Sequence, residues 1–291
     1  MTRLSSLLLA LAALFLLSPF AWGQEIISQT APGQETITLE RGRVAPVLDK
    51  VGWVLGLPNK LLLWDRRADN HEISAETEQR VVEYLAENDL EGVKVRVNQY
   101  DPLGEWRRLR ENDRIGAGWR YTVGSLYTLG YTLLPGRLLG GDSYNPYTDT
   151  VNIYSDIPAI AVEQAAYAKD VHSRERPGGY AALQSLPLVA LTHENQTKQD
   201  VFEHFDQHGD PAERAEARRV LYPQLGVEVG GQIGTLVPQG MALMQLAGAA
   251  VGHVAGQKEA ERVSQSAVAE GHTAKPSVPV AAHPAGAWNG Y

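Results

Sequence analysis

Glu163, Gln164 and Tyr167 are the residues whose types and spacing come nearest to a reactive site. If this stretch is helical, residues 163 and 167 share one face, one turn apart, and residue 164 lies beside them. A carboxylate such as Glu163 can bind a metal ion. Gln164 has no carboxylate to accept a proton, and Tyr167 is a poor metal ligand at neutral pH because a tyrosine ordinarily titrates at about 10. The spacing therefore fits a metal site better than the residue types do.

The same spacing occurs in the H-E-x-x-H pattern of zinc metallopeptidases, where two histidines bind zinc and the glutamate activates water. Here the stretch reads Glu163-Gln164-Ala165-Ala166-Tyr167. The helical frame of that pattern is kept, but all three functional residue types are replaced. We therefore expect no catalytic residue at these positions.

Further metal-binding candidates are His193 and Glu194, on an expected helix over 187–208. In this arrangement Glu163, His193 and Glu194 would supply the ligands, and Asp200 would orient the histidine from outside. The alternative is that Glu163 and Glu194 are polar residues of a cleft or a surface and bind no metal.

A second candidate metal site is His204-x-x-x-His208, with Glu203 or Asp206 nearby. Two histidines four residues apart on a helix can chelate a metal ion. However, histidine is also favoured at the C-terminal end of a helix by the helix dipole. The pair therefore has a structural explanation as well.

A polar loop, Gly140–Tyr147, precedes the expected strand Thr150–Tyr154 and offers Asp142, Tyr144 and Asn145 as cleft residues. The simpler interpretation is a tight loop that needs glycine and asparagine for backbone reasons. Serine-hydrolase, phosphate-loop and dinucleotide-binding motifs do not occur at suitable places in the sequence.

The element that positions Glu163 is an expected helix over 157–172, which follows the strand Thr150–Tyr154 directly. β-branched and aromatic residues alternate in the strand, and Pro158 fits the first turn of the helix because its missing N–H is not needed there. Arg174–Gly179 ends the helix. We expect the strand to be an edge strand of a small sheet.

The rest of the first half predicts a mixture of helices and strands. Helices are expected at Arg43–Leu57, Ala75–Asn88 and Glu105–Asn112. Strands are expected at Lys60–Trp64, Val93–Val97, Trp119–Thr122, Leu126–Leu134 and Arg137–Leu139, with the first two forming a parallel β-α-β unit. The fold class is α+β: a small mixed sheet, a helix after its edge strand and a mostly helical C-terminal half.

The C-terminal half contains an uncharged stretch, Val229–Gln257, in which Gly248, Gly252 and Gly256 recur every four residues. Small residues at this spacing let helix backbones approach closely. The stretch is either a buried helical hairpin, divided at Pro238–Gly240, or a segment inserted in a membrane.

The ends of the chain have compositions of their own. Residues 1–23 are typical of a secretory signal peptide, with Arg3 before the apolar run Leu7–Leu17; the alternative is an uncleaved membrane anchor. Residues 24–42 are expected to be a loose lead-in with at most one strand, at Thr36–Leu39, residues 43–257 one domain and residues 258–291 a disordered tail.

The absence of cysteine and the negative net charge exclude several kinds of site and of partner. Export without any cysteine excludes disulfides, thiolate metal sites and a cysteine nucleophile. Removing residues 1–23 removes one arginine and leaves 34 acids against 25 bases, a net charge of −9. An acidic chain without basic runs argues against nucleic acid or anionic lipid as a partner.

Three stretches of the sequence resemble a family of uncharacterised exported bacterial proteins with a zincin-like core: Asn98–Asn112, Gly140–Asp156 and Ala161–Asp170. The resemblance implies that the third stretch occupies the place of the H-E-x-x-H helix. The sequence departs from that motif at Glu163, Gln164 and Tyr167.

We therefore expect an exported, zincin-like protein of the periplasm or cell envelope that lacks the standard catalytic residues and a bound cofactor. It would bind a protein or peptide partner, or serve a structural role. One alternative is a metal-dependent hydrolase that uses zinc or another divalent ion at Glu163, His193 and Glu194. The other is a membrane-embedded structural component organised by Gly248, Gly252 and Gly256.

Overall fold

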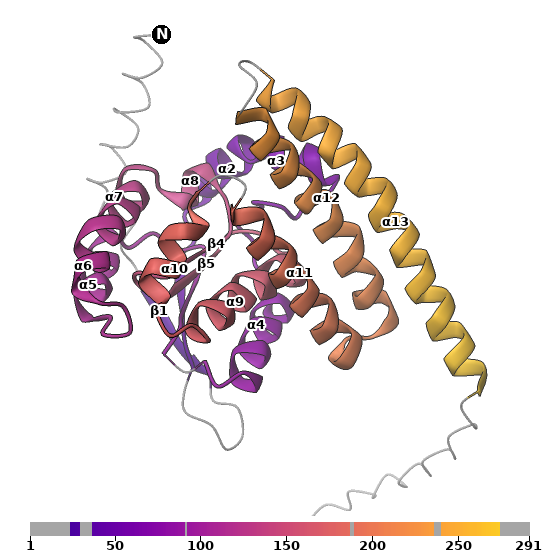
Figure 1. Cartoon of the computed structure of the whole chain (residues 1–291), viewed down its shortest axis with the longest axis horizontal. Helices are drawn as coiled ribbons and strands as arrows, with labels where there is room; N and C mark the ends of the chain where they lie inside the picture. The colour runs from indigo at the N-terminus through magenta and orange to yellow at the C-terminus, as the bar shows by residue number, and fades with distance from the viewer. Residues whose placement is uncertain (1–23, 30–36, 91, 187–188, 236–239, 274–291) are drawn as a thin grey trace, which may run out of the picture.

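The computed structural model describes residues 24–29, 37–90, 92–186, 189–235 and 240–273. The predictions of a signal peptide over 1–23 and of a tail over 274–291 lie outside these residues. Within them the chain forms one small sheet with helices packed around it and a long helical hairpin on one side (Figure 1).

The sheet is mixed and has the strand order β1-β2-β3-β5-β4. Its strands are β1 (Gln24–Gln29), β2 (Ile37–Gly42), β3 (Lys94–Val97), β4 (Ser143–Asn145) and β5 (Thr150–Ile153). The three central strands are parallel, and each outer strand is antiparallel to its neighbour. The predicted α+β class, with a small mixed sheet and a helical C-terminal half, is confirmed.

The lead-in is part of this sheet. The strand predicted at Thr36–Leu39 corresponds to β2, whereas the prediction of a loose segment is wrong for residues 24–29, which form β1. Backbone pairing places Gln24 opposite Gly42 and Leu39 opposite Val95. The parallel unit therefore runs from β2 through α4 (Ala75–Glu87) to β3. As expected, Ser74 caps α4 by accepting a hydrogen bond from the Thr77 N–H.

The predicted strand Lys60–Trp64 is wrong, because these residues belong to α3 (Leu57–Leu63), which follows α2 (Pro46–Leu55). A short apolar run cannot be assigned to strand or helix by periodicity alone. Here Pro58 lies in the first turn of α3, and the helix contacts the C-terminal hairpin rather than the sheet.

The three strands predicted over 119–139 are also wrong. This part is α6 (Ala117–Trp119), a π-helical turn (Arg120–Gly124), α7 (Ser125–Leu133) and α8 (Gly136–Leu139). Tyrosine, threonine and valine favour strands only where a sheet surface is there to pack against. That place beside β5 is taken by β4, and α7 packs against α5 (Pro102–Glu111) instead.

The strand that leads into the central helix, β5, lies one position inside the edge, so its prediction as the edge strand is wrong. Among the described strands, β4 forms that edge, because the loop after Asn145 turns the chain back onto β5. Asp149 completes the turn with a positive φ of 53°. The turn residues were recognised in the sequence, but the short strand before them was not.

Helix α9 (Pro158–His172) is buried on almost all sides. It contacts α4, α11 (Val189–His208) and the two strands β4 and β5, and its alanines and valines belong to the main hydrophobic core. Its few polar side chains are therefore enclosed by protein. Figure 1 shows it between α4 and α11, in the middle of the molecule.

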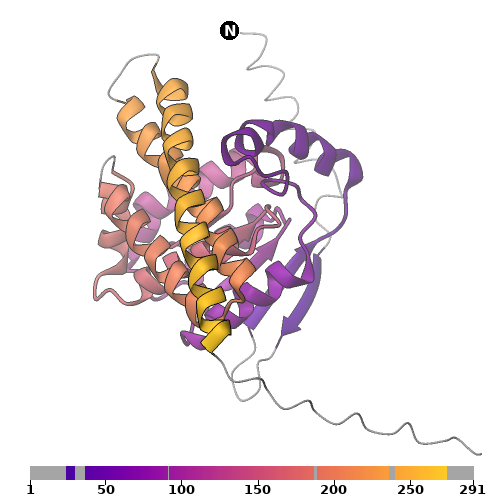
Figure 2. The same ribbon diagram turned by 90° about the vertical axis from the view of Figure 1, so that its right-hand side faces the viewer.

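The C-terminal half consists of α10 (Pro177–Gln184), α11 (Val189–His208), α12 (Pro211–Thr235) and α13 (Met241–Thr273). Helices α12 and α13 run side by side as a hairpin (Figures 1 and 2). Because α13 extends to Thr273, the prediction of disorder is wrong for residues 258–273.

The glycines of the uncharged stretch lie in the contact between the two hairpin helices. A Cβ added at Gly248 would lie 1.9 Å from the Gly226 carbonyl oxygen, and one at Gly252 would lie 2.4 Å from the Tyr222 oxygen. At Gly256 the nearest atom is the Arg218 oxygen, at 2.6 Å. The helix-packing role predicted for these glycines is confirmed. No helix in the described part of the chain is both long and apolar enough to cross a membrane.

Candidate functional site

The predicted site residues Glu163 and Glu194 do converge, and a lysine lies between them. The Nζ atom of Lys198 donates a hydrogen bond to Glu163, lies 2.8 Å from a carboxylate oxygen of Glu228 and lies 3.4 Å from one of Glu194. The side chains of Lys198 and Glu163 are 1% and 3% exposed. Three carboxylates from α9, α11 and α12 thus surround one buried ammonium group, which we call the Lys198 cluster.

Local structure explains why these groups meet. Glu194 and Lys198 are four residues apart on α11, so they share one face of that helix. The face packs against α9, which carries Glu163, and against α12, which carries Gln224 and Glu228. Gln224 donates hydrogen bonds to Glu163 at 2.7 Å and to Glu228 at 3.2 Å. Two of the three carboxylates that face Lys198, those of Glu163 and Glu228, are therefore also held by Gln224.

Burial and the surplus of negative charge set the protonation of the cluster. Burial raises the pKa of Glu163, although Lys198 opposes the shift. Burial also raises the pKa of Glu228 to about 8, although a quarter of its side chain is exposed. For Lys198, burial alone would lower the pKa, but the three carboxylates raise it far above its usual value. The lysine is therefore charged at neutral pH, and Glu228 holds a proton up to about pH 8.

Sequence reasoning missed Lys198, Gln224 and Glu228. A signal for Lys198 existed, because it follows Glu194 by one helical turn. Glu228 stands immediately before the uncharged stretch and gave no comparable signal.

The two other motif positions are packing positions. Tyr167 lies against the rings of His193 and Tyr144, with centroid distances of 4.0 and 5.3 Å. Burial raises the pKa of the Tyr167 hydroxyl well above its ordinary value. It stays protonated at neutral pH and cannot act as an anionic ligand. Gln164 is half-buried on α9, and its amide has no proton-accepting group.

His193 does not join the Lys198 cluster, contrary to its prediction as a partner of Glu163. Its Nδ1 atom lies 2.8 Å from a carboxylate oxygen of Asp170, which also accepts hydrogen bonds from Tyr180 and Arg174. Burial would raise the pKa of Asp170, but these three donors hold it below its ordinary value. Nε2 of His193 is buried and has no hydrogen-bond partner among the described residues.

Asp200 does not orient His193, so its prediction as an outer partner of a metal ligand is wrong. Its carboxylate accepts hydrogen bonds from Tyr84 at 2.5 Å and from Lys169 at 2.7 Å, on the side of α11 that faces α4. The orienting carboxylate is that of Asp170, which lies one turn after Tyr167 on α9. Which neighbouring element a helical residue faces depends on how the helices pack, and the spacing of residues in the sequence does not show this.

The cleft candidates of the polar loop have structural partners. Asp142 accepts hydrogen bonds from the N–H groups of Tyr154 and Ser155. Tyr144 donates to Asp149, and the Asn145 side chain accepts from the Tyr147 N–H. The loop interpretation fits these contacts, and only Tyr144 also touches a motif residue, Tyr167.

The second predicted site gains a third group from another helix. Nδ1 of His204 lies 3.2 Å from a carboxylate oxygen of Glu87, and Nδ1 of His208 lies 3.7 Å from it. One ligand atom of each residue lies within 4.8 Å of the others, a spacing that could hold a divalent ion. Neither Glu203 nor Asp206 belongs to this group. The same contacts are also those of a hydrogen-bonded end of α11.

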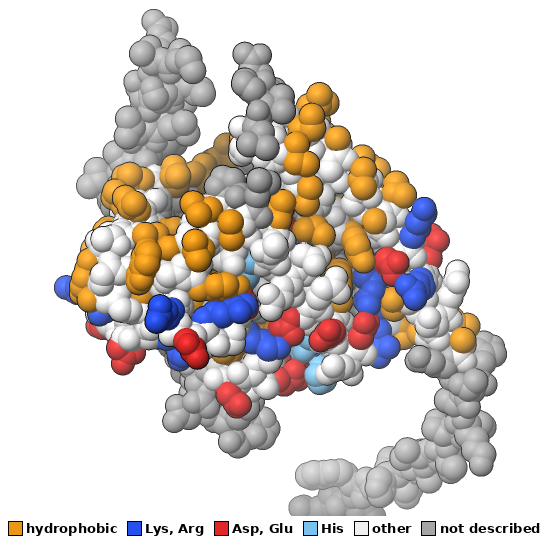
Figure 3. Space-filling view, in the orientation of Figure 1, with side chains coloured by type: hydrophobic (Ala, Val, Ile, Leu, Met, Phe, Trp, Pro, Cys, Tyr) orange, Lys and Arg blue, Asp and Glu red, His pale blue; other side chains and the backbone are white. Residues whose placement is uncertain are grey.

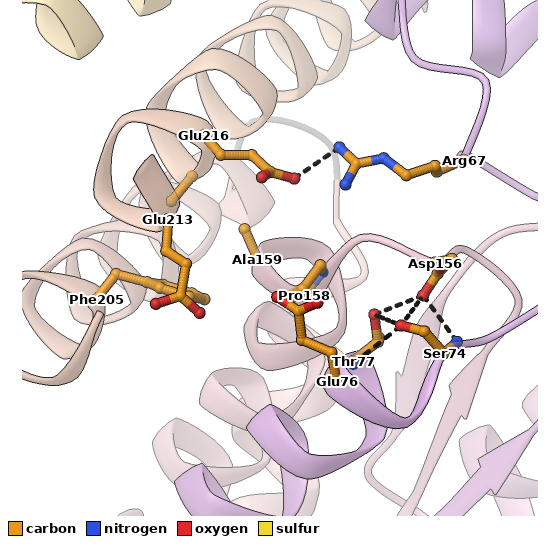
Figure 4. Close-up of a pocket in the computed structure, with 11 residues that line it drawn as sticks. Arg67, Ser74, Glu76, Thr77, Asp156, Pro158, Ala159, Phe205, Glu213 and Glu216 are labelled. Carbon is orange, nitrogen blue, oxygen red and sulfur yellow. Dashed lines mark hydrogen bonds and ion pairs between the residues drawn. The ribbon is translucent and has the colours of Figure 1, made fainter. Parts of the chain in front are cut away.

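Several cavities lie outside the Lys198 cluster, and one of them, of about 310 Å³, is lined by Asp200. A pocket of about 60 Å³ at the start of α9 has room for a few water molecules. There Asp156 accepts hydrogen bonds from Ser74 and Thr77 and so ties α4 to α9, and Arg67 pairs with Glu216 (Figure 4). A larger cavity of about 490 Å³ lies beside α2 and is lined by His71 and Asn98, among others. None of the predicted site residues lines either of these last two cavities.

Zinc does not fit the Lys198 cluster as this chain builds it. A zinc ion needs its ligand atoms about 2.0–2.2 Å away and cannot share their centre with a charged ammonium. The cluster also contains no histidine, the nitrogen ligand of the H-E-x-x-H pattern. A cation does occupy the middle of the carboxylates, and it is the side chain of Lys198 itself.

No family model, no curated protein and no solved structure matches this chain.

Proposed function

We propose that this chain is an exported, zincin-like protein of the cell envelope that does not catalyse peptide hydrolysis and instead binds a protein or peptide or serves a structural role. One observation carries the proposal. The ammonium of Lys198 lies among Glu163, Glu194 and Glu228, beside the helix that the sequence resemblance compares with the H-E-x-x-H helix.

A built-in ammonium supports a structural role for the cluster. It neutralises part of the carboxylate charge and ties α9, α11 and α12 together, as a bound cation would. Unlike a metal ion, it has no open coordination position, so it cannot lower the pKa of a water molecule or polarise a carbonyl group. Gln164 has no carboxylate that could act as a general base, which also argues against catalysis.

The binding part of the proposal draws on the edge strand β4, which contacts the α9 helix. Ser143 is exposed at the start of this strand. An extended peptide can add to a sheet edge through backbone hydrogen bonds, without any catalytic group. Here the exposed end of β4 at Ser143 offers such an edge, whereas Tyr144 and Asn145 are buried. A protein that has lost hydrolysis can therefore retain recognition.

Metal content and peptidase activity test the proposal together. The full chain is purified without chelators and analysed for zinc, manganese and iron, beside a His208→Ala variant. We expect the wild-type protein to hold well under one ion per chain at the Lys198 cluster. Any metal held by Glu87, His204 and His208 disappears in the variant, which separates the two sites.

Activity is then measured on a mixed library of quenched fluorescent peptides. We expect no hydrolysis by the wild-type protein and none by Gln164→Glu, because a restored base still lacks a metal-bound water. Chelator-sensitive hydrolysis that Gln164→Ala abolishes would contradict the proposal and favour the alternative, a hydrolase with a rearranged site.

A further inference from the structure

Large apolar side chains are exposed together on one side of the molecule, although they come from elements far apart in the sequence. Figure 3 shows them along the upper side and most charged side chains on the lower side. We call this the apolar face, and its members are Val44, Val47 and Val54 near α2, Leu126, Leu129 and Leu133 on α7, Leu183 and Leu186 near the end of α10, and Ile233, Met241, Leu243 and Leu246 on the hairpin.

The helices that carry the apolar face end on the same side of the fold. Figures 1 and 2, which differ by a quarter turn, both place α2 and the beginning of α13 there, and Figure 1 places α7 beside them. The face is therefore a property of the tertiary structure and not of one amphipathic helix. Its members are well exposed: Leu126 is 69% and Leu243 is 67% exposed.

Three of the four segments that form the face lack charged residues; the fourth, around α2, carries Arg43, Asp49 and Lys50 beside its valines. Residues 121–136, 177–192 and 229–257 contain no aspartate, glutamate, lysine or arginine. A surface that faces only water normally carries charges of both signs among its apolar residues, and large uncharged apolar surfaces mark interaction sites. The face is therefore suited to a partner that is itself apolar.

The position of the described N-terminal end indicates which partner that is. Gln24 pairs with Gly42, two residues before Val44. The 23 residues that precede Gln24 contain the apolar run Leu7–Leu17. During export, before residues 1–23 are removed, a sequence suited to a membrane thus joins the fold beside the apolar face.

Aromatic residues give a second indication. Trp119, Tyr121 and Tyr127 are partly exposed on and before α7, next to the leucines of the face. Tryptophan and tyrosine are enriched where protein meets the headgroup layer of a membrane, because one end of each ring is apolar and the other polar.

We propose that the apolar face is a lipid-binding surface by which the protein lies on a bilayer without crossing it. The face inserts the leucines of α7 and of the hairpin into the boundary between headgroups and acyl chains. Because three of its four segments are uncharged, its binding depends on apolar contact and not on anionic lipid, and added salt leaves it nearly unchanged.

Cysteine labelling tests this directly, because the natural sequence has no cysteine. Leu126→Cys, Leu243→Cys and Val268→Cys are made singly in the full chain and labelled with an environment-sensitive fluorophore. Val268 is the matched control: it is 60% exposed and lies on α13 with Leu243, about 37 Å along the helix. On adding phosphatidylcholine vesicles, we expect a blue shift and at least a twofold brighter signal at positions 126 and 243, and no change at 268.

A charge test complements the labelling. The double variant Leu126→Asp/Leu243→Asp is expected to float with vesicles at least tenfold less than the wild-type protein, whereas Val268→Asp floats equally well. Binding that requires anionic lipid and disappears in salt would overturn the proposal. So would vesicle binding without a shift at positions 126 and 243, because another part of the chain would then hold the protein.

Two remaining outcomes are also decisive against a lipid surface. A blue shift that grows with protein concentration in the absence of vesicles would assign the face to a second copy of this chain. Failure to bind vesicles at all, with no shift at any label, would mean that lipid is not the partner.

Discussion

The ammonium group of Lys198 donates a hydrogen bond to the carboxylate of Glu163, and neither side chain is more than 3% exposed. The two residues lie on neighbouring helices and are 35 positions apart in the sequence. Separating two such charges leaves each of them buried without compensation, which costs far more than the loss of a surface ion pair. The pair therefore couples the stability of α9 to that of α11.

Replacing the lysine tests this coupling. In Lys198→Met the side chain keeps its length but leaves Glu163 and Glu228 without a counter-ion. We expect the free energy of unfolding at pH 8 to fall by about 3–5 kcal/mol in urea titrations. The control, Lys169→Met, removes the half-exposed ion pair with Asp200 and should cost less than about 1 kcal/mol. Equal losses in the two variants would contradict a special role for Lys198.

Removing the lysine side chain should also open the cluster to metal. In Lys198→Ala, three carboxylates remain within 4.8 Å of one another around an empty centre. Oxygen ligands of this kind suit manganese or calcium. We expect either ion to raise the melting temperature of Lys198→Ala and to leave that of the wild-type protein unchanged. A further Glu163→Gln change should abolish the effect, and an equal shift in the wild-type protein would show that the ions bind elsewhere.

The cluster also predicts a pH dependence of stability. The pKa of Glu228 is about 8 in the folded protein and about 4.3 in an unfolded chain. Between these values the folded state holds the extra proton, so its stability is full below about pH 4 and is lost as pH rises through 8. The slope for one proton is at most about 1.4 kcal/mol per pH unit.

Glu228→Gln should flatten this dependence between pH 5 and 8.5, whereas the exposed control Glu203→Gln should leave it unchanged. Urea unfolding at several pH values measures both. If the free energy of unfolding of the wild-type protein rises between pH 5 and 8.5, the predicted direction of the pH dependence is wrong.

The hydrogen-bonded group of His193 and Asp170 predicts the opposite pH dependence of stability at acid pH. Hydrogen bonds from His193, Tyr180 and Arg174 hold the pKa of Asp170 below its ordinary value, so the stability it contributes is present above about pH 4 and is lost as pH falls. Asp170→Asn should lower the free energy of unfolding at pH 7 by about 2–4 kcal/mol, because it leaves buried donors poorly paired. The difference from the wild-type protein should narrow at pH 3. A constant difference would place the effect in packing alone.

The close contact between α12 and α13 predicts that two glycines of α12 differ in how well they tolerate replacement by alanine. A Cβ at Gly226 would lie 2.0 Å from the backbone oxygen of Gly248, so α12 and α13 must separate. We expect Gly226→Ala to lower the free energy of unfolding by about 1–3 kcal/mol.

Gly231→Ala is the control, because its nearest neighbour is the flexible end of Gln245, at 3.3 Å. There the better helix propensity of alanine should leave stability equal or slightly higher. Thermal unfolding followed by circular dichroism compares the two variants, and a similar loss in both would contradict the close approach.

The sequence by itself determined the elements whose signals are local. The α9 helix follows from Pro158, its alanine-rich face and its stop near Arg174, and the shared face of Glu163 and Tyr167 follows from helical geometry alone. The spacing of Gly248, Gly252 and Gly256 likewise determined that a helix would pack closely there. These features depend on residues within a few turns of one another.

Tertiary structure alone decided what those residues meet. It placed Lys198 and Glu228 beside Glu163, turned His193 toward Asp170 and folded residues 119–139 as helices once β4 had taken the place beside β5. The physical reason is that charge pairing and strand pairing depend on distances between elements, whereas a sequence pattern reports only the environment within one element. The pairing of Glu163 with Lys198 is such a relationship, because the two side chains come from different helices, 35 positions apart in the sequence.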